Sequence, residues 1–191
     1  MSQQIFKLDL HHPDINMIQD WKNEIAAAWQ VKQAIMEADK NRVWTYHLPN
    51  VAATEDQILS AEKQLGYQLD ERYRSFLKFA NGWEGFVQTI DLFGTEDLIA
   101  GQRKETGEFI FSCLEDSVLK KSGVRRDELL VIGATSRHSD LFVITLPNSL
   151  APGTVIWFAS EEIQRFSSFD EFFLAMVDYN RLDLNALRNS K

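Results

Sequence analysis

Apolar residues recur at helical spacing in the first forty residues of the chain. In residues 15–39 they fall every three or four positions, at Ile15, Ile18, Trp21, Ile25 and Trp29. This period predicts an amphipathic helix, and Asp14 is the expected N-terminal cap. We expect the apolar side of this helix to dock on the rest of the chain, although a helix that recruits a partner would show the same pattern.

Two further helices are predicted from their end signals. Thr54 and Gln57 form a capping box, and Gly66 can adopt the left-handed conformation that ends a helix. Asp70 is the expected cap of the next helix, whose apolar stripe consists of Tyr73, Phe76, Leu77 and Ala80. The break at residues 47–50 suggests a helical extension over residues 1–46 and a main domain over residues 47–191.

Short apolar runs then predict a sheet. Runs of strand length occupy residues 86–93, 109–111, 129–132, 141–146, 155–158 and 163–166. Most linkers between them are too short for crossover helices, which favours antiparallel or mixed pairing. Residues 114–121 could form a short helix. The predicted fold class is therefore α+β, with a largely antiparallel or mixed sheet flanked by helices.

A closing helix follows a second capping box, formed by Ser168 and Glu171. Its expected buried side consists of Phe169, Phe172, Phe173, Met176 and Val177. Three leucines, Leu182, Leu184 and Leu187, are expected to extend this helix or to follow it.

The order and spacing of several short motifs resemble the SMI1/KNR4 (SUKH) superfamily. The motifs are Leu65-Gly66, Phe76-Leu77, Asn81-Gly82-Trp83, Leu92-Phe93-Gly94, Ile132-Gly133 with Asp140, and Phe172-Phe173-Leu174. The resemblance implies helices packed around a largely antiparallel sheet, and it brings no catalytic residues with it. It also implies a role in protein binding, because many bacterial members look like immunity proteins that neutralise toxins, often nucleases or deaminases, while fungal members act in signalling and cell-wall control. Residues 1–46 fall outside the resemblance.

Composition and charge limit the classes of partner. The 191 residues carry a formal net charge of −8. Residues 1–50 hold five Lys or Arg and six Asp or Glu, so the acidity belongs to the main domain. Such a field disfavours direct binding of nucleic acid and favours a basic protein partner, although solubility alone would also explain it.

The cell compartment is predicted from what the chain does not contain. Charges interrupt every apolar stretch before it reaches the length of a membrane span, and no signal-peptide pattern is recognisable. The single cysteine, Cys113, cannot form an internal disulfide. We therefore expect a cytoplasmic protein that does not act at a membrane.

Candidate catalytic and metal-binding groups are weak. Ser136, His138 and Asp140 are spaced so that their side chains would splay, and no nucleophile elbow precedes them. The adjacent pair His11-His12 lacks a recognised ligand spacing. We therefore expect no catalytic residue, no metal and no cofactor.

The sequence thus favours a non-enzymatic binding module, in particular an immunity protein that occludes a basic toxin domain. Our candidates for the partner-binding surface are Trp83, Glu84, Asp91 and Asp140, with Trp83 as either an exposed anchor or a core residue. One alternative is a regulatory scaffold that recruits its partner through the helix at residues 15–39. A second alternative is a small-molecule enzyme, which would require a polar pocket with perturbed titratable groups.

Overall fold

The structure, a computed structural model, describes residues 17–189. These residues form one six-stranded sheet in the order β1-β2-β3-β4-β5-β6, with every neighbouring pair antiparallel. The strands are β1 (Trp83–Val87), β2 (Ile90–Leu92), β3 (Leu129–Ala134), β4 (Asp140–Thr145), β5 (Val155–Ala159) and β6 (Glu162–Phe166). The helices are α1 (Trp21–Ala38), α2 (Glu55–Leu65), α3 (Glu71–Leu77), α4 (Gln102–Cys113), α5 (Asp116–Lys121) and α6 (Phe169–Asn189), with a 3-10 turn η1 (Arg126–Glu128). The predicted α+β class is confirmed.

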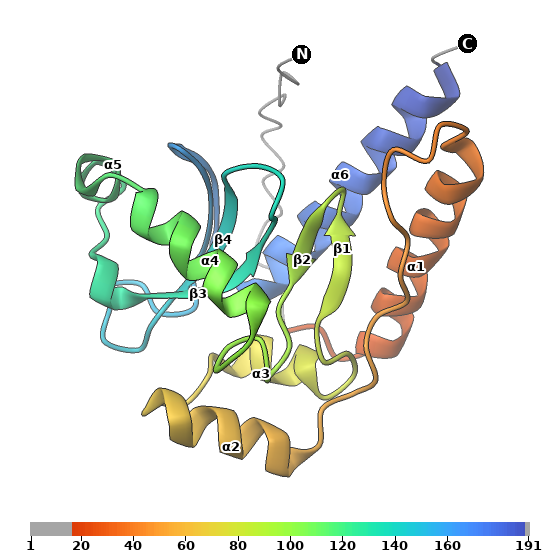
Figure 1. Cartoon of the computed structure of the whole chain (residues 1–191). Helices are drawn as coiled ribbons and strands as arrows, with labels where there is room; N and C mark the ends of the chain where they lie inside the picture. The colour runs from red at the N-terminus through yellow and green to blue at the C-terminus, as the bar shows by residue number, and fades with distance from the viewer. Residues whose placement is uncertain (1–16, 190–191) are drawn as a thin grey trace.

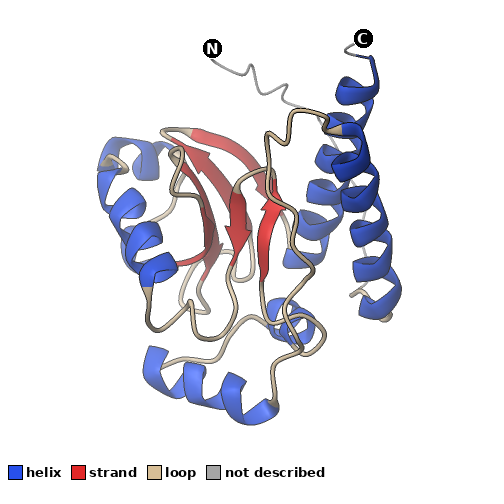
Figure 2. Ribbon diagram, turned by 45° about the vertical axis from the view of Figure 1, so that its right-hand side comes forward, coloured by secondary structure: helices blue, strands red, loops and turns tan. Residues whose placement is uncertain are grey.

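Helices cover both faces of the sheet. Figure 1 shows α4 lying across one face while α6 runs along the other, with α1 beside α6. The helices α2 and α3 close one end of the molecule, and the curvature of the sheet around its packed helices is clear in Figure 2. Trp21, Ile25 and Ala28 of α1 belong to the same buried cluster as the sheet residues. The described part of the predicted N-terminal extension therefore shares its core with the rest of the chain.

Most of the predicted helix ends are confirmed. Thr54 and Gln57 form both hydrogen bonds of a capping box, and Gly66 ends α2 in the left-handed region with φ 82°. The Oδ1 atom of Asp70 accepts from the backbone N–H groups of Arg72 and Tyr73 at 3.0 and 3.1 Å. The two N-terminal caps could be predicted from the sequence because their side chains accept hydrogen bonds from backbone N–H groups that the first turn of a helix leaves without a partner.

The second predicted box is confirmed only in half. The Ser168 hydroxyl accepts from the Glu171 N–H at 3.3 Å, as expected. The Glu171 carboxylate, however, accepts from the N–H and the hydroxyl of Ser167, each at 2.6 Å, and not from Ser168. The return bond is displaced by one residue because Ser167 offers two donors to the same oxygen.

The first helix begins later than its pattern predicts. Residues 17–20 are not helical, and α1 starts at Trp21, where the Asp20 side chain accepts from the Asn23 N–H. Asp14 and Ile15 lie outside the described residues. The N–H of Ile18 instead donates to the buried carboxylate of Asp170 at 2.7 Å. This contact fixes the chain before α1 against the start of α6.

The predicted strand at residues 109–111 is wrong, because this run lies within α4. Gly107 is buried on the side of α4 that packs on the sheet. A Cβ atom at Gly107 would lie 2.9 Å from Cγ1 of Val131 and 3.2 Å from Cζ of Phe93. Phe109 is 69% exposed on the outer side of the helix. Consecutive apolar residues therefore face different environments, which a short run of letters cannot reveal.

The predicted single strand at residues 86–93 is also wrong, because the segment forms a hairpin. It contains the end of β1, a turn, and the whole of β2. Gln88 adopts a positive φ of 52° at this turn. Non-glycine residues are uncommon in that region, and Gln88 gave no turn signal.

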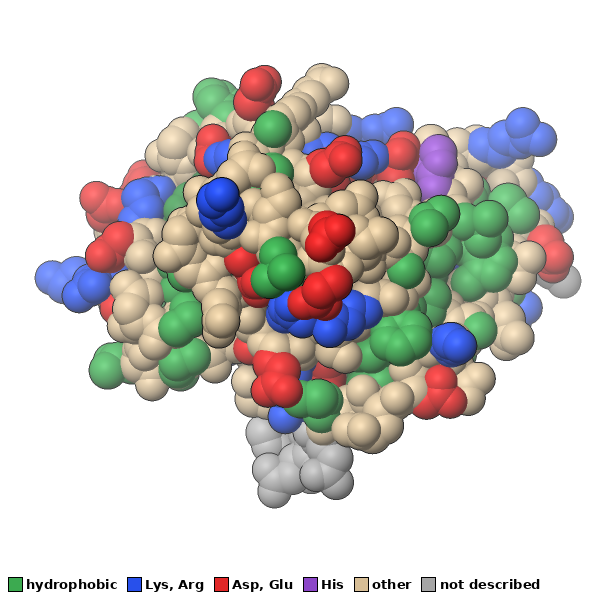
Figure 3. Space-filling view, turned by 90° about the horizontal axis from the view of Figure 1, so that it is seen from below, with side chains coloured by type: hydrophobic (Ala, Val, Ile, Leu, Met, Phe, Trp, Pro, Cys, Tyr) green, Lys and Arg blue, Asp and Glu red, His purple; other side chains and the backbone are tan. Residues whose placement is uncertain are grey.

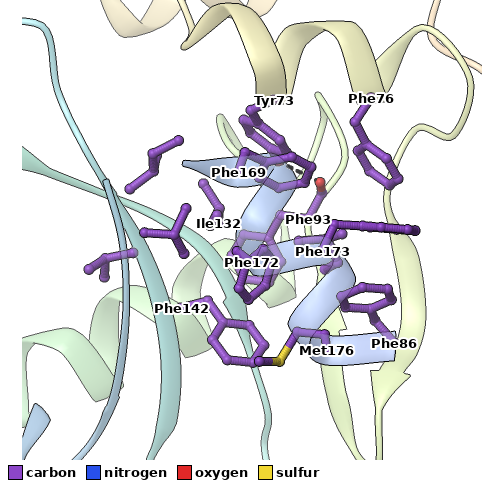
Figure 4. Close-up of a cluster of buried hydrophobic side chains, with 14 of the residues drawn as sticks. Tyr73, Phe76, Phe86, Phe93, Ile132, Phe142, Phe169, Phe172, Phe173 and Met176 are labelled. Carbon is purple, nitrogen blue, oxygen red and sulfur yellow. Dashed lines mark hydrogen bonds between the residues drawn. The ribbon is translucent and has the colours of Figure 1, made fainter. Parts of the chain in front are cut away.

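The core is an aromatic cluster around the N-terminal half of α6. Figure 4 shows Phe169, Phe172 and Phe173 pointing from α6 among side chains of the sheet and α3. The Phe172 ring lies 4.8 Å from that of Phe142, and the Phe173 ring 5.4 Å from that of Phe86, between centroids. Such contacts add to the stabilisation from apolar burial. The hydroxyl of Tyr73 donates to the Phe93 carbonyl at 2.6 Å, so this polar atom is satisfied inside the cluster.

Replacing Phe172 with alanine should strongly destabilise the protein. The side chain is fully buried, and truncating a core phenylalanine costs about 3–5 kcal/mol of unfolding free energy. The matched control is Phe109→Ala on the exposed side of α4, which should cost less than about 1 kcal/mol. Chemical denaturation of both variants tests the assignment of the core, and equal losses would contradict it.

Candidate functional site

A bulge in β1 organises the region that holds most of the predicted site residues. Trp83 pairs with Leu92 and Val87 pairs with Ile90, and the register shifts between these two pairs. The bulged residue Gly85 has φ +59°. A bulge interrupts the ladder, so its buried backbone groups need other partners.

Side chains from three other elements supply those partners. The N–H of Gly85 donates to Oδ1 of Asp91 on β2 at 2.7 Å. The carbonyl of Gly85 accepts from Nζ of Lys32 on α1, which also lies 3.4 Å from the carbonyl of Phe86. Asn180 of α6 donates its amide to the same Phe86 carbonyl at 3.1 Å. Lys32, Asp91 and Asn180 thus fix the bulge from three directions.

Lys32 is a buried cation, only 2% exposed. Its burial lowers its pKa to about 8, although attraction from Asp183 and Asp91 offsets part of that effect. The ring of Tyr46 lies 5.8 Å from Nζ. Burial also raises the pKa of Asp183, although hydrogen bonds from Gln88 and the charge of Lys32 oppose this shift. The cation fixes α1 to the edge of the sheet.

Glu84 and Asp91, two of the predicted surface residues, lie together around Arg103 of α4. Nε of Arg103 donates to Asp91 Oδ2 at 2.8 Å, and a terminal nitrogen donates to Glu84 Oε2 at 2.8 Å. Asp97 lies 3.7 Å from the guanidinium, and His47 lies 3.2 Å from Glu84. Partial burial lowers the pKa of Arg103, but attraction from the three carboxylates outweighs it and the pKa is raised. Three acids around one arginine leave a local excess of negative charge.

A shallow pocket of about 210 Å³ adjoins this cluster. It is lined by Asp91, Phe93, Gln102, Arg103, Thr106, Ala134 and Ser136. Its volume lies below the ~300–1,000 Å³ that is usual for small-molecule sites. The pocket also lacks a nucleophile paired with a base, since its two charged lining residues are bonded to each other.

Trp83 lies inside the molecule. Its side chain is fully buried, and its indole Nε1 donates to the carbonyl of His47 at 2.8 Å. The ring packs 5.6 Å from that of Phe86, between centroids. The structure thus agrees with the interpretation of Trp83 as a core residue and leaves no indole surface for a partner to contact.

Asp140 is separated from the other predicted residues by the sheet itself. Its Oδ1 atom accepts from Nε1 of Trp157 at 2.8 Å, on the face where Trp157 packs against Tyr179 of α6. Asp91 lies on the opposite face, where it contacts Arg103 of α4. Burial raises the pKa of Asp140, although the bond from Trp157 and the nearby His138 oppose this effect. One flat partner surface therefore cannot use Asp91 and Asp140 together.

The other candidate groups are not assembled for chemistry. In the part of the chain that the structure describes, no hydrogen bond joins Ser136, His138 and Asp140, and the three residues lie at the turn into β4. Within residues 17–189 no group of three or more His, Cys, Asp or Glu side chains could hold a metal ion. His11 and His12 lie outside the described residues. None of the described helices is long and apolar enough to span a bilayer.

Comparison with known proteins assigns the family. A sequence profile of the SMI1 / KNR4 family (SUKH-1) matches residues 52–175. The chain belongs to this family. The match begins just before α2 and ends within α6, so α1 and residues 39–51 precede the matched region. A search of curated proteins found no significant match.

Sequence reasoning missed the two residues that organise this region, Lys32 and Arg103. Lys32 occupies a buried position of α1, one turn after Ala28 and three residues before Ile35. A lysine on the apolar side of a predicted helix is a usable signal, because lysine is almost never buried without a partner. Arg103 carried no such signal, since the segment around it was not predicted to be helical.

Replacing Lys32 with methionine should change how stability depends on pH. Unfolded, the lysine keeps its usual pKa of 10.5, whereas the folded value is about 8. Between these values the unfolded state binds more protons, so rising pH favours the folded state. From about pH 7.5 to about pH 9.5 Lys32 should therefore add about 2 kcal/mol to the unfolding free energy.

The measurement is the difference in unfolding free energy between wild type and Lys32→Met across this pH range. Lys22→Met, an exposed position on the same helix, is the control and should follow wild type. A pH-independent difference between wild type and Lys32→Met would contradict a buried, charged Lys32.

Replacing Arg103 with alanine should leave three carboxylates without their shared cation. We expect a loss of about 1–2 kcal/mol in unfolding free energy, as for charge-assisted hydrogen bonds that are partly exposed. Lys104→Ala is the control, because Lys104 pairs with a single carboxylate, Glu108, and should cost at most about 0.5 kcal/mol. If both variants lose the same stability, Arg103 does not organise the cluster.

Proposed function

We propose that this protein is a non-enzymatic binding module, specifically an immunity protein that neutralises a bacterial toxin domain by covering its active site. Membership of the SUKH-1 family carries the proposal. Toxins of the nuclease or deaminase type act on nucleic acid and need a basic surface to hold a phosphate backbone. A protein with net charge −8 complements such a surface.

The geometry around Arg103 supports binding over catalysis. The charged groups of this region are bonded to one another, and Asp91 also holds the backbone of the β1 bulge. Groups fixed in this way are suited to presenting a constant shape and charge. Because little has to be ordered on association, a rigid surface loses less affinity to conformational entropy.

The regulatory scaffold remains the alternative function, but the structure gives it no specific support. In that hypothesis the first helix recruits a partner through its apolar side. Trp21, Ile25 and Ala28 on that side of α1 are buried in the common core. A scaffold of this kind would need a different surface.

Co-expression tests the proposal. Cells that produce the toxin domain encoded beside this gene should survive when they also produce this protein. In vitro, the purified protein should bind a catalytically inactive form of that domain, and the association rate should fall as salt is raised, because opposite charges steer the encounter. The control is an unrelated toxin domain, which should remain lethal. Unchanged killing in the presence of soluble, folded protein would contradict the proposal.

A further inference from the structure

Exposed apolar side chains are frequent at the end of α1 and in the segment that follows it. Nine large hydrophobic residues are exposed in the described part of the chain, and four of them fall within residues 36–51. These four are Met36, Val43, Leu48 and Val51. Within this group Val51 is 89% exposed and Leu48 63%. Single exposed apolar residues are normal, but a concentration of them marks an interaction surface.

The segment that carries Leu48 and Val51 is held firmly in place. We call residues 39–54 the α1–α2 connection. The N–H of Asn50 donates to the Gly82 carbonyl at 3.0 Å, and its side chain donates to the Asn81 carbonyl at 2.9 Å. The N–H of Ala53 donates to the Leu77 carbonyl at 2.8 Å. The connection therefore lies along residues 77–82, and its backbone has a fixed position there.

One more exposed hydrophobic residue, Phe79, belongs to the segment along which the connection lies. Phe79 is 38% exposed and lies within residues 77–82, to which the connection is bonded. Figure 3 views the end of the molecule that carries α2 and α3, and hydrophobic side chains gather on the right-hand part of this face. We call Leu48, Val51 and Phe79 the apolar patch.

Two groups of ion pairs lie close to the segment that carries the apolar patch. Glu84, Asp91 and Asp97 surround Arg103, and Glu84 also lies 3.2 Å from His47, the residue before Leu48. At the start of α2, Arg74 and Lys78 pair with Glu55, and Arg74 also pairs with Glu62. Glu62 is buried, so the exposed or half-buried members of these two groups are four acids and three bases, and the two groups together carry a negative charge. Their charge is complementary to a basic partner and would repel an acidic one.

We infer that the apolar patch, with its negative surroundings, is the docking surface for the basic toxin domain. This inference rests on the proposed function and assigns its binding surface. The partner presents an apolar protrusion to Leu48, Val51 and Phe79, and its lysines or arginines face Glu84 and the neighbouring carboxylates. Burial of the apolar side chains supplies affinity, while the surrounding charges orient the partner. The surface lies partly outside the family match, because Leu48 and Val51 precede residue 52.

The test uses the double variant Leu48→Asp, Val51→Asp in the full chain. Its matched control is Leu150→Asp, since Leu150 is 97% exposed on the connection between β4 and β5. Affinity for the inactive toxin domain encoded beside the gene is measured by surface plasmon resonance or calorimetry. Thermal unfolding of both variants checks that they are folded.

We expect the double variant to bind at least tenfold more weakly than wild type, and Leu150→Asp to bind within twofold of wild type. Equal binding by the double variant and wild type would contradict the assignment of the apolar patch as the docking surface, but it would not contradict the proposed function. An equal loss in Leu150→Asp also overturns the patch. Absence of binding by the wild type overturns the proposed function and this inference with it. A homodimer that dissociates in the double variant would assign the patch to self-association and overturn it as a toxin surface.

Discussion

The bulge in β1 is the constraint on which the rest of this region depends. It removes ladder hydrogen bonds from a strand that is buried by α1 and α6, and unpaired buried backbone groups are costly. Lys32, Asp91 and Asn180 satisfy these groups from three separate elements. The first helix is therefore a structural partner of the sheet, because the bulge needs a cation from it. The chain between α1 and α2 then has to pass along the β1 edge.

This arrangement divides the acids of the surface into two kinds. Asp91 is held between a backbone amide and a guanidinium, so its carboxylate serves mainly to maintain the hairpin. Glu84 is 41% exposed on its side chain and keeps one face toward solvent near His47. An interaction surface in this region would therefore have a fixed carboxylate at Asp91 and a solvent-exposed carboxylate at Glu84. Such a surface is the kind that the proposed binding function requires.

The sequence predicted what is encoded locally. The box at Thr54 and Gln57, the Gly66 ending and the Asp70 cap depend on neighbours within a few residues, and each is present. The strand predicted at residues 109–111 was wrong because three consecutive apolar residues do not distinguish a strand from part of a helix, and this run lies within α4. The predicted binding residues also lie in different places: Trp83 is buried, Glu84 and Asp91 contact Arg103, and Asp140 contacts Trp157. Whether Asp91 and Asp140 share a face depends on strand pairing, and the sequence does not display that pairing.

The exposed surface was the least predictable feature. Leu48 and Val51 lie in a segment whose proline and asparagine indicate only a break between elements. Nothing in those letters says that Asn50 bonds to Gly82 and Asn81, or that the apolar side chains beside it stay in water. The side chains of Leu48 and Val51 are exposed because the backbone of their segment is hydrogen-bonded to residues 77–82, a contact that the sequence does not display.

The central claim is that the α1–α2 connection is a fixed part of the folded unit, and amide hydrogen exchange tests it most directly. The N–H groups of Asn50 and Ala53 donate to carbonyls of Gly82 and Leu77. Measured by NMR in the free protein, these two amides should be strongly protected and should exchange far more slowly than an open chain. Exchange of both at open-chain rates, while the amides of β3 and β4 stay protected, would contradict the claim.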